Sequence, residues 1–269
     1  MTFRTHAVRG LVLSSLALGL SACGGDGAAL RFTSNDRAVD ISSAWVQAAS
    51  EPVPSTVFQS SDGTSFTLTQ ARIHLRDIRL DLPKGKKCED VKGLLSGAEC
   101  KAADDSKTLV VPGPIVVDLM TGTTTPDISG LVIPAGTYKR IDFRLEEAKA
   151  EDVGANEPLV GYSFLARADF SVDGAARKLE MFFKFSEDAR FESSTGVEVP
   201  EGGSLIAFLK PQVWLEGLPL GDCIRSGDVE VANNTVRIDA KAGGKCGDAE
   251  GTVKSNIKKS GDLRKSEEK

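Results

Sequence analysis

The sequence predicts an all-β protein, an antiparallel β-sandwich with one short helix near its C-terminus. Two observations predict this fold. Apolar and polar residues alternate with period two over several stretches of strand length, and turn signals such as Asp173-Gly174 separate these stretches. Only the segment 248–259 has a helical pattern, and Val253 and Ile257 are the residues that would hold it against the body.

The first 22 residues have the build of an export signal. Arg4 and Arg9 precede an apolar run, 11–20, that is too short to span a bilayer. The quartet Leu20-Ser21-Ala22-Cys23 then resembles the lipobox of bacterial lipoproteins, in which the cysteine is acylated and becomes the first residue of the mature chain. We therefore expect a lipid anchor at Cys23, with a plain secretory signal or an uncleaved anchor as the alternatives.

The lipobox also predicts where in the cell the protein is located. Because Gly24 follows the cysteine where an aspartate would resemble an inner-membrane retention signal, the resemblance favours the outer membrane of a bacterial cell envelope over the inner membrane. The expected partners are the membrane, through the lipid anchor, and other envelope proteins.

The cysteine count predicts two disulfides. With Cys23 acylated, Cys88, Cys100, Cys223 and Cys246 remain, and an even set in an exported protein indicates disulfide bonds. Of the three possible connectivities we expect local pairing, Cys88 with Cys100 and Cys223 with Cys246, each worth about 3 kcal/mol. A metal site built from these cysteines is the alternative, but C-x-x-C spacing is missing.

The mature chain is acidic. The full sequence has a net charge of −5, and removing the signal takes away Arg4 and Arg9, so the mature net charge becomes −7. Nucleic acids and anionic lipopolysaccharide bind proteins through a concentrated positive field, so an acidic chain predicts neither as a partner. The lysine cluster at 84–87 is interpreted as a solvated loop.

Composition divides the mature chain into three parts. Residues 23–36 are rich in Gly and Ala and predict a flexible tether. Residues 37–220 carry the strand patterns, beginning with a first strand near 38–48, and predict the β-sandwich domain. Residues 221–269 predict a disulfide-containing appendage with a weak strand near 235–239 and the short helix.

Two strand patterns are the most informative. Between 65 and 82 the parity of the alternation flips near Gln70 and again near Arg76, which predicts two β-bulges or bends in a long, kinked strand pair. Residues 161–186 alternate into Asp173-Gly174 and back out, which predicts a hairpin. Further strands are expected at 108–120, 141–145 and 204–215.

Three motifs carry a family resemblance over roughly residues 60–215: Ala71-Arg72-Ile73-His74-Leu75-Arg76-Asp77-Ile78, Val116-Val117-Asp118-Leu119 and Pro134-Ala135-Gly136-Thr137-Tyr138-Lys139-Arg140-Ile141. In this order they resemble bacterial lipoproteins with an immunoglobulin-like or transthyretin-like β-sandwich domain of unknown function. The resemblance implies a fold and carries over no catalytic residue.

One stretch has the ligand spacing of a calcium loop. Asp169, Ser171, Asp173 and Glu180 stand at positions 1, 3, 5 and 12 of an EF-hand pattern, with glycine at position 6. Both flanks alternate with period two where that motif needs helices, so we interpret the stretch as an Asp-Gly hairpin and expect no metal and no cofactor.

His74 is the only histidine of the mature chain, and the pattern places it beside Arg72 and Arg76 on the polar face of a strand, where it is expected to be solvated. A Ser-His-Asp triad would have to use it, and no G-x-S-x-G context accompanies it. The sequence thus favours a non-catalytic binding or structural module of the envelope. The alternative is an enzyme, or a ligand or metal carrier, facing the periplasm with a site built on loops.

Overall fold

The computed structural model describes residues 27–33, 56–92, 98–103, 106–128, 131–185, 188–238 and 242–265. This part of the chain is mostly β and carries a large mixed sheet and few helices. The strands are β1 (Gly27–Thr33), β2 (Thr56–Gln59), β3 (Ser65–Asp81), β4 (Glu99–Ala103), β5 (Ser106–Asp118), β6 (Thr124–Thr125), β7 (Val132–Pro134), β8 (Gly136–Leu145), β9 (Phe164–Val172), β10 (Ala175–Phe183), β11 (Asp188–Val199), β12 (Ser204–Leu209), β13 (Val231–Ala232), β14 (Thr235–Ile238) and β15 (Gly261–Lys265). The helices are α1 (Cys88–Val91), α2 (Ala150–Val153), α3 (Leu220–Ser226) and α4 (Ala249–Lys259), with 3-10 turns η2 (Pro211–Val213) and η3 (Gly244–Cys246).

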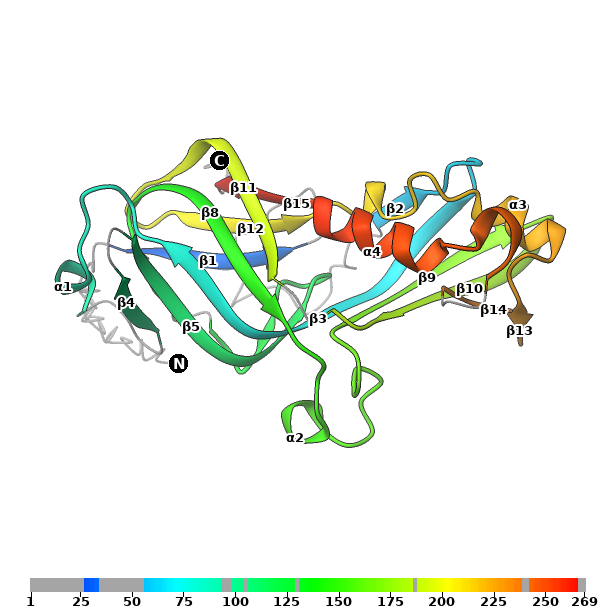
Figure 1. The fold of residues 1–269 in the computed structure, drawn as a ribbon, viewed down its shortest axis with the longest axis horizontal. Coiled ribbons are helices and arrows are strands. Elements are labelled where there is room, and N and C mark those ends of the chain that lie inside the picture. The colour runs from blue at the N-terminus through cyan, green and yellow to red at the C-terminus, as the bar shows by residue number, and fades with distance from the viewer. Residues whose placement is uncertain are drawn as a thin grey trace, which may run out of the picture.

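The strand β3 is the axis of the molecule. Along one side it pairs with β9 through its first part and with β8 through its second, and along the other side it pairs with β2 and then β5 (Figure 1). The register shifts between Leu68 and Gln70 and again between Leu75 and Asp77. Both predicted bulges are thereby confirmed, in one continuous strand of 17 residues where the sequence predicted a strand pair.

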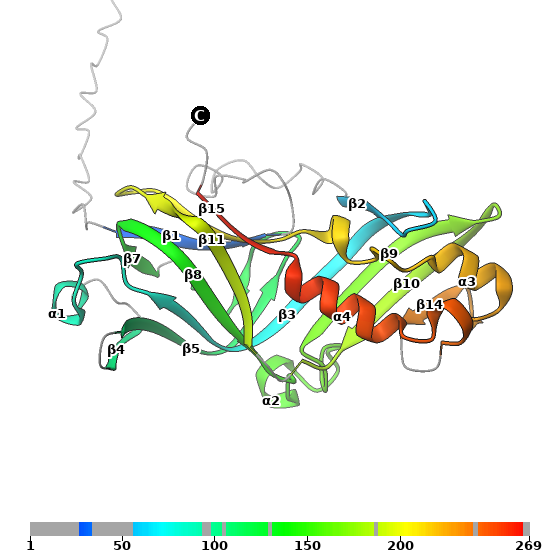
Figure 2. The ribbon, with the colours of Figure 1, turned by 45° about the horizontal axis from the view of Figure 1, so that its top comes forward.

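The two parts of β3 belong to differently built halves. In the two-sheet half, β5, β8 and β11 lie with the second part of β3, and a four-stranded sheet in the order β15-β12-β1-β7 forms the other layer (Figure 2). In the helix-covered half, β9, β10 and β14 lie with the first part of β3, and α3 and α4 lie along them. One apolar core runs through both halves and includes Leu205 and Leu263 of the smaller sheet.

The pairing corrects the expectation of a purely antiparallel fold. β1 pairs with β12 in parallel, and β10 pairs with β14 in parallel, so both sheets are mixed. Strands adjacent in space but distant in the chain need no hairpin between them, and so they are free to run in either direction. The hairpin of β9 and β10 is confirmed, with Asp173 and Gly174 at φ 53° and 76° in its turn.

Two predicted segments are different in the structure. The tether expected at 23–36 is wrong for Gly27–Thr33, which form β1 between β7 and β12. The C-terminal appendage is also wrong as a separate unit, because β14 extends the large sheet, β15 extends the small one, and Val253 and Ile257 of α4 are buried in the common core. The strand expected near 38–48 lies outside the described residues.

Among the residues that the structure describes, Trp214 and Tyr138 are the largest fully buried side chains. Trp214 ends the 3-10 turn that Pro211 begins, so the strand expected over 204–215 stops at Leu209. Its ring packs edge-on against the Phe164 ring, with 5.4 Å between the ring centroids, and its indole N–H donates a hydrogen bond to the Ser260 hydroxyl. The Tyr138 hydroxyl donates to the carbonyl oxygen of Pro134, four residues upstream, which ties β8 back to the end of β7. Among the described residues, no helix is long and apolar enough to cross a membrane.

Candidate functional site

The loop between β8 and β9, residues 146–163, covers part of the outer face of the large sheet. It contains α2 and projects from the sheet in Figure 1. A small apolar cluster, separate from the main core, holds it down: Ala148 and Leu159 of the loop pack with Val116 and Leu165 of the strands. The loop therefore has its own packing on a face that the sequence pattern describes as polar.

Ion pairs reinforce this cover. Three basic side chains of the strands or their ends each meet an acidic side chain of the 146–163 loop. Arg72 with Glu157 and Lys184 with Glu147 are ion pairs, and His74 faces Asp152. Lys184 and Glu147 are about half exposed, so that pair contributes little, whereas the other two are more enclosed.

His74 lies beneath the loop with 2% of its surface exposed, so the expectation of a solvated histidine is wrong. Its Nδ1 is 2.8 Å from the carbonyl oxygen of Glu146, and a carbonyl only accepts, so Nδ1 carries a proton. Its Nε2 faces the Asp152 carboxylate at 3.5 Å and makes no hydrogen bond with any residue that the structure describes.

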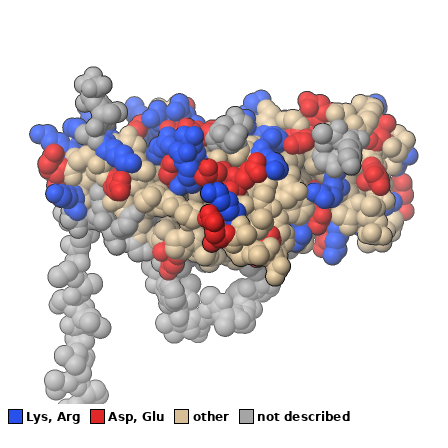
Figure 3. Space-filling model, turned by 60° about the horizontal axis from the view of Figure 1, so that its bottom comes forward, with Lys and Arg blue, Asp and Glu red and all other residues tan. Residues whose placement is uncertain are grey.

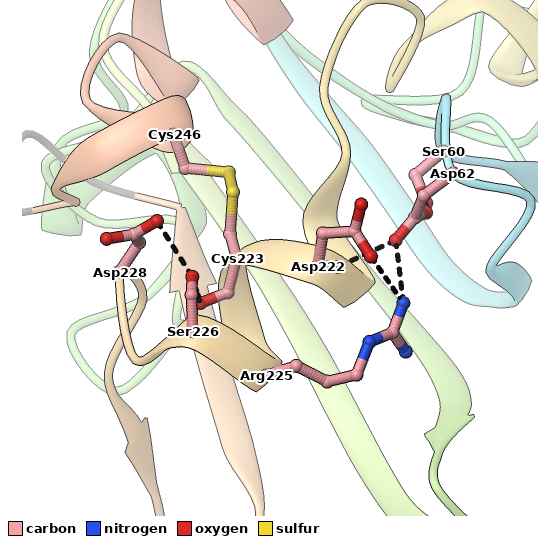
Figure 4. Close-up of a disulfide and its surroundings, with 8 residues drawn as sticks. All are labelled: Ser60, Asp62, Asp222, Cys223, Arg225, Ser226, Asp228 and Cys246. Atoms are coloured by element: carbon pink, nitrogen blue, oxygen red, sulfur yellow. Dashed lines mark hydrogen bonds and ion pairs between the residues drawn. A yellow bond between two sulfur atoms is a disulfide. The ribbon is translucent and has the colours of Figure 1, made fainter.

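The far end of the helix-covered half has a second polar cluster, centred on Asp62 (Figure 4). Its carboxylate accepts hydrogen bonds from the Ser60 hydroxyl at 2.5 Å, from the Thr64 amide, and from the Asp222 amide at 2.7 Å in the first turn of α3. The guanidinium group of Arg225 lies 3.6 Å from the Asp62 carboxylate. Burial raises the pKa of Asp62, but the hydrogen bonds from Ser60, Thr64 and Asp222 outweigh it, so the pKa is lowered overall.

These contacts connect distant parts of the chain. Asp62 stands in the turn between β2 and β3, and it satisfies a free N–H group at the start of α3, which has no capping side chain of its own. In Figure 4 the Cys223–Cys246 disulfide lies on the same short helix and joins it to η3. Asp62 and the disulfide together fasten this end of the molecule.

An apolar pocket opens between the two halves. It is lined mostly by aromatic and aliphatic side chains of β3, β8, β9, β11, β12 and α4, and its free space is about 20 Å³, room for about one water molecule. The lining includes Phe143, Phe164, Phe185 and Phe191. The apolar side chains therefore nearly fill the space between the halves, and the lining also includes Lys258.

The outer face of the two-sheet half is strongly charged. Asp77 on β3 pairs with Arg79 at 2.8 Å, and Asp142 on β8 pairs with Arg140 at 3.3 Å and Arg190 at 2.8 Å. The aspartates are nearly buried while the arginines extend outward, and the Asp142 carboxylate raises the pKa of Arg190. Basic and acidic side chains lie interleaved on the face of the molecule shown in Figure 3.

The candidate residues from the sequence are placed as follows. Cys88 is bonded to Cys100 and Cys223 to Cys246, the pairing that was predicted. Cys23 lies outside the described residues.

The four residues of the calcium pattern do not surround a common point. Asp169 and Ser171 lie on β9, Asp173 lies in the turn, and Glu180 lies on β10, where its carboxylate pairs with Arg167 at 3.0 Å. In the described ranges, no three His, Cys, Asp or Glu side chains are grouped as a metal site would require. The Asp-Gly hairpin is therefore what the stretch forms.

Comparison with known proteins gives no relative. No protein family, no curated protein and no solved structure matches this chain.

Proposed function

We propose that this chain is a lipid-anchored protein of a bacterial cell envelope, held by Cys23, that acts as a non-catalytic binding or structural module. One observation carries the proposal: the quartet Leu20-Ser21-Ala22-Cys23 is followed almost at once by the folded body, because β1 begins at Gly27. A chain that folds directly after an acylation motif is built to work at the lipid surface.

The anchor is tested by fractionation of cells that make the full chain. Cys23→Ser removes the acylated sulfur and should move the protein from the membrane fraction to the soluble fraction. Ser21→Ala keeps a small residue before the cysteine and should leave the protein in the membrane. A Cys23→Ser protein that still pellets with membranes would contradict the anchor.

The binding role is tested by crosslinking in intact envelopes. We expect the acylated chain to capture a defined protein that the Cys23→Ser form, which lacks the membrane context, captures less. The outer membrane, favoured by Gly24, is tested in the same cells by separating the two membranes on a density gradient.

We also propose that the two-sheet half is an immunoglobulin-like or transthyretin-like sandwich. The support is that its two sheets share one core and that Tyr138 donates its hydroxyl proton to a backbone carbonyl just upstream. A tyrosine with this bond at the corner between two strands recurs in immunoglobulin-like sandwiches. An experimental structure of the soluble Cys23→Ser protein tests this assignment.

A further inference from the structure

The structure and the anchor together determine which end of the molecule meets the membrane. This inference rests on the proposed acylation of Cys23. Only three residues separate Cys23 from Gly27, the first residue of β1. An extended chain spans at most about 3.6 Å per residue, so Gly27 lies within about 14 Å of the acylated cysteine. A tether this short restricts the orientations that the folded body can take at the membrane surface.

The strand pairing defines the neighbours of Gly27. Gly27 pairs with Pro134 at the end of β7, and Gly136, at the start of β8, pairs with Val199 at the end of β11. Gly136 in turn packs on the ring of Pro83 so closely that a β-carbon there would lie 2.5 Å from it. The turn that follows Pro83 therefore belongs to the same end of the molecule as Gly27.

That turn carries a run of lysines. Lys84, Lys86 and Lys87 are all exposed, and none of them forms a side-chain ion pair with any residue that the structure describes. Figures 1 and 2 both show α1, which follows Lys87 directly, at the end of the molecule where β1 begins. Three free ammonium groups thus stand beside the point where the chain leaves for the bilayer.

The acidic groups of this end, which include the exposed Glu201 between β11 and β12, are at least as numerous as the three lysines but have shorter side chains. Glu89 and Asp90 lie in α1, and one carboxylate oxygen of Asp90 is occupied by the backbone N–H of Lys87. Glu198 lies at the end of β11 on the same end of the molecule. Lysine places its charge on a flexible four-carbon stem, so the ammonium groups extend farther from the turn than these carboxylates do.

We propose that the turn 84–87 is a second membrane contact, in which Lys84, Lys86 and Lys87 bind the phosphates of anionic lipid headgroups. The surface potential extends about 8 Å at physiological ionic strength, so this contact requires the short tether to bring the turn close to the bilayer. The long axis of the molecule then leads away from the bilayer, and the end that carries Asp62 and the Cys223–Cys246 disulfide is presented to partners.

The test is lysine footprinting of the full acylated protein on vesicles. The protein is reconstituted into phosphatidylcholine vesicles with or without phosphatidylglycerol, and the rate at which an amine-reactive reagent labels each lysine is measured by mass spectrometry. On the anionic vesicles we expect labelling of Lys84, Lys86 and Lys87 to slow about fivefold, the factor that corresponds to ~1 kcal/mol per headgroup contact. Lys178 and Lys245, exposed in the other half, should not change.

A charge-reversal pair separates the contact from simple crowding. In Lys84→Glu/Lys86→Glu, labelling of Lys87 on anionic vesicles should rise to its rate on neutral vesicles, whereas the matched Lys178→Glu/Lys245→Glu variant should keep Lys87 protected. The contact is overturned if, in the native protein, anionic vesicles slow the labelling of all five lysines by the same factor, or if Lys84, Lys86 and Lys87 are labelled at the same rate on both vesicle types. Flotation of the vesicles is read separately: a protein that does not float has no working anchor, and both proposals then fail.

Discussion

The two halves of the molecule use the same strand and protect it in different ways. In the two-sheet half, the second part of β3 is covered by another sheet, whereas in the helix-covered half the first part is covered by helices, a tryptophan and a buried disulfide. A sheet covers a sheet over a wide area with many small contacts. Helices cover it at a few points, so single side chains there should matter more.

Trp214 is expected to give the largest effect. Trp214→Ala should lower the free energy of unfolding by about 3–5 kcal/mol, because the indole is fully buried against Phe58 and Phe164 and its loss leaves a cavity. Urea unfolding followed by circular dichroism measures this. Ile133→Val in the two-sheet half, also fully buried, should cost only about 0.5–1.5 kcal/mol. A similar cost for both variants would remove the contrast between the halves.

The disulfides compare the halves directly. Replacing either pair by alanines should cost about 3 kcal/mol through loop entropy. Loss of Cys223–Cys246 should cost more than loss of Cys88–Cys100, because its sulfurs are buried and its loop is longer, with a sequence separation of 23 against 12. Thermal unfolding of the two double variants, each against the native chain, ranks them. The reverse order would show that the lysine-rich loop is part of the stable core.

His74→Ala tests the cover on the outer face at the junction of the halves. Removal of the imidazole leaves the Glu146 carbonyl without its partner at Nδ1, removes the contact with the Asp152 carboxylate, and should cost about 2 kcal/mol. Amide hydrogen exchange should speed up over 146–163 and not over β9. The control is Lys184→Ala, which removes a half-exposed pair and should cost less than about 1 kcal/mol. Unchanged exchange in the loop would mean that its apolar cluster alone holds it.

Asp62 links β3 to α3, and its effect should depend on pH. The pKa of Asp62 is lowered in the folded state from the ordinary value of 3.8, so its charged form stabilises the fold above that value. This stabilisation is lost as the pH falls below 3.8 towards the folded pKa. Asp62→Asn should cost about 1.5 kcal/mol at neutral pH and flatten this part of the acid unfolding curve. A variant with an unchanged curve would show that the cluster is not coupled to folding.

Tyr138 gives the smallest expected effect, in the two-sheet half. Tyr138→Phe removes the bond to the Pro134 carbonyl and should cost about 1 kcal/mol. Burial raises the pKa of the phenol above its ordinary value of 10.0, so the native chain loses stability as the pH rises above 10. The phenylalanine variant should lack this alkaline loss. Unfolding curves at neutral and alkaline pH compare the two, and an equal loss in both would exclude the phenol as its source.

Local signals in the sequence predicted much of this fold. The parity flips in 65–82 identified both bulges of β3, the Asp173-Gly174 turn identified the hairpin, and the spacing of Val253 and Ile257 identified the buried face of α4. In each case the residues that determine the structure lie within one element or one turn.

The features that were missed depend on distant partners. β1 has the sequence Gly-Ala-Ala-Leu-Arg-Phe-Thr, which looks like a tether, and it becomes a strand because β7 and β12 offer hydrogen bonds on both sides. His74 is buried because a loop 72 residues downstream folds over it. No local sequence pattern in 27–33 or around His74 indicates such a distant partner.

The shared strand β3 also determines how the chain can be divided. β3 contributes hydrogen bonds to both halves. A truncation that keeps β3 with one half therefore removes the central strand of the other half, and it leaves β3 with an unpaired edge where that half was. The part of the chain that the structure describes therefore cannot be cut between its halves into two modules that each keep β3 fully paired. Gene fusions and insertions should be made in the turns at the two ends of the molecule.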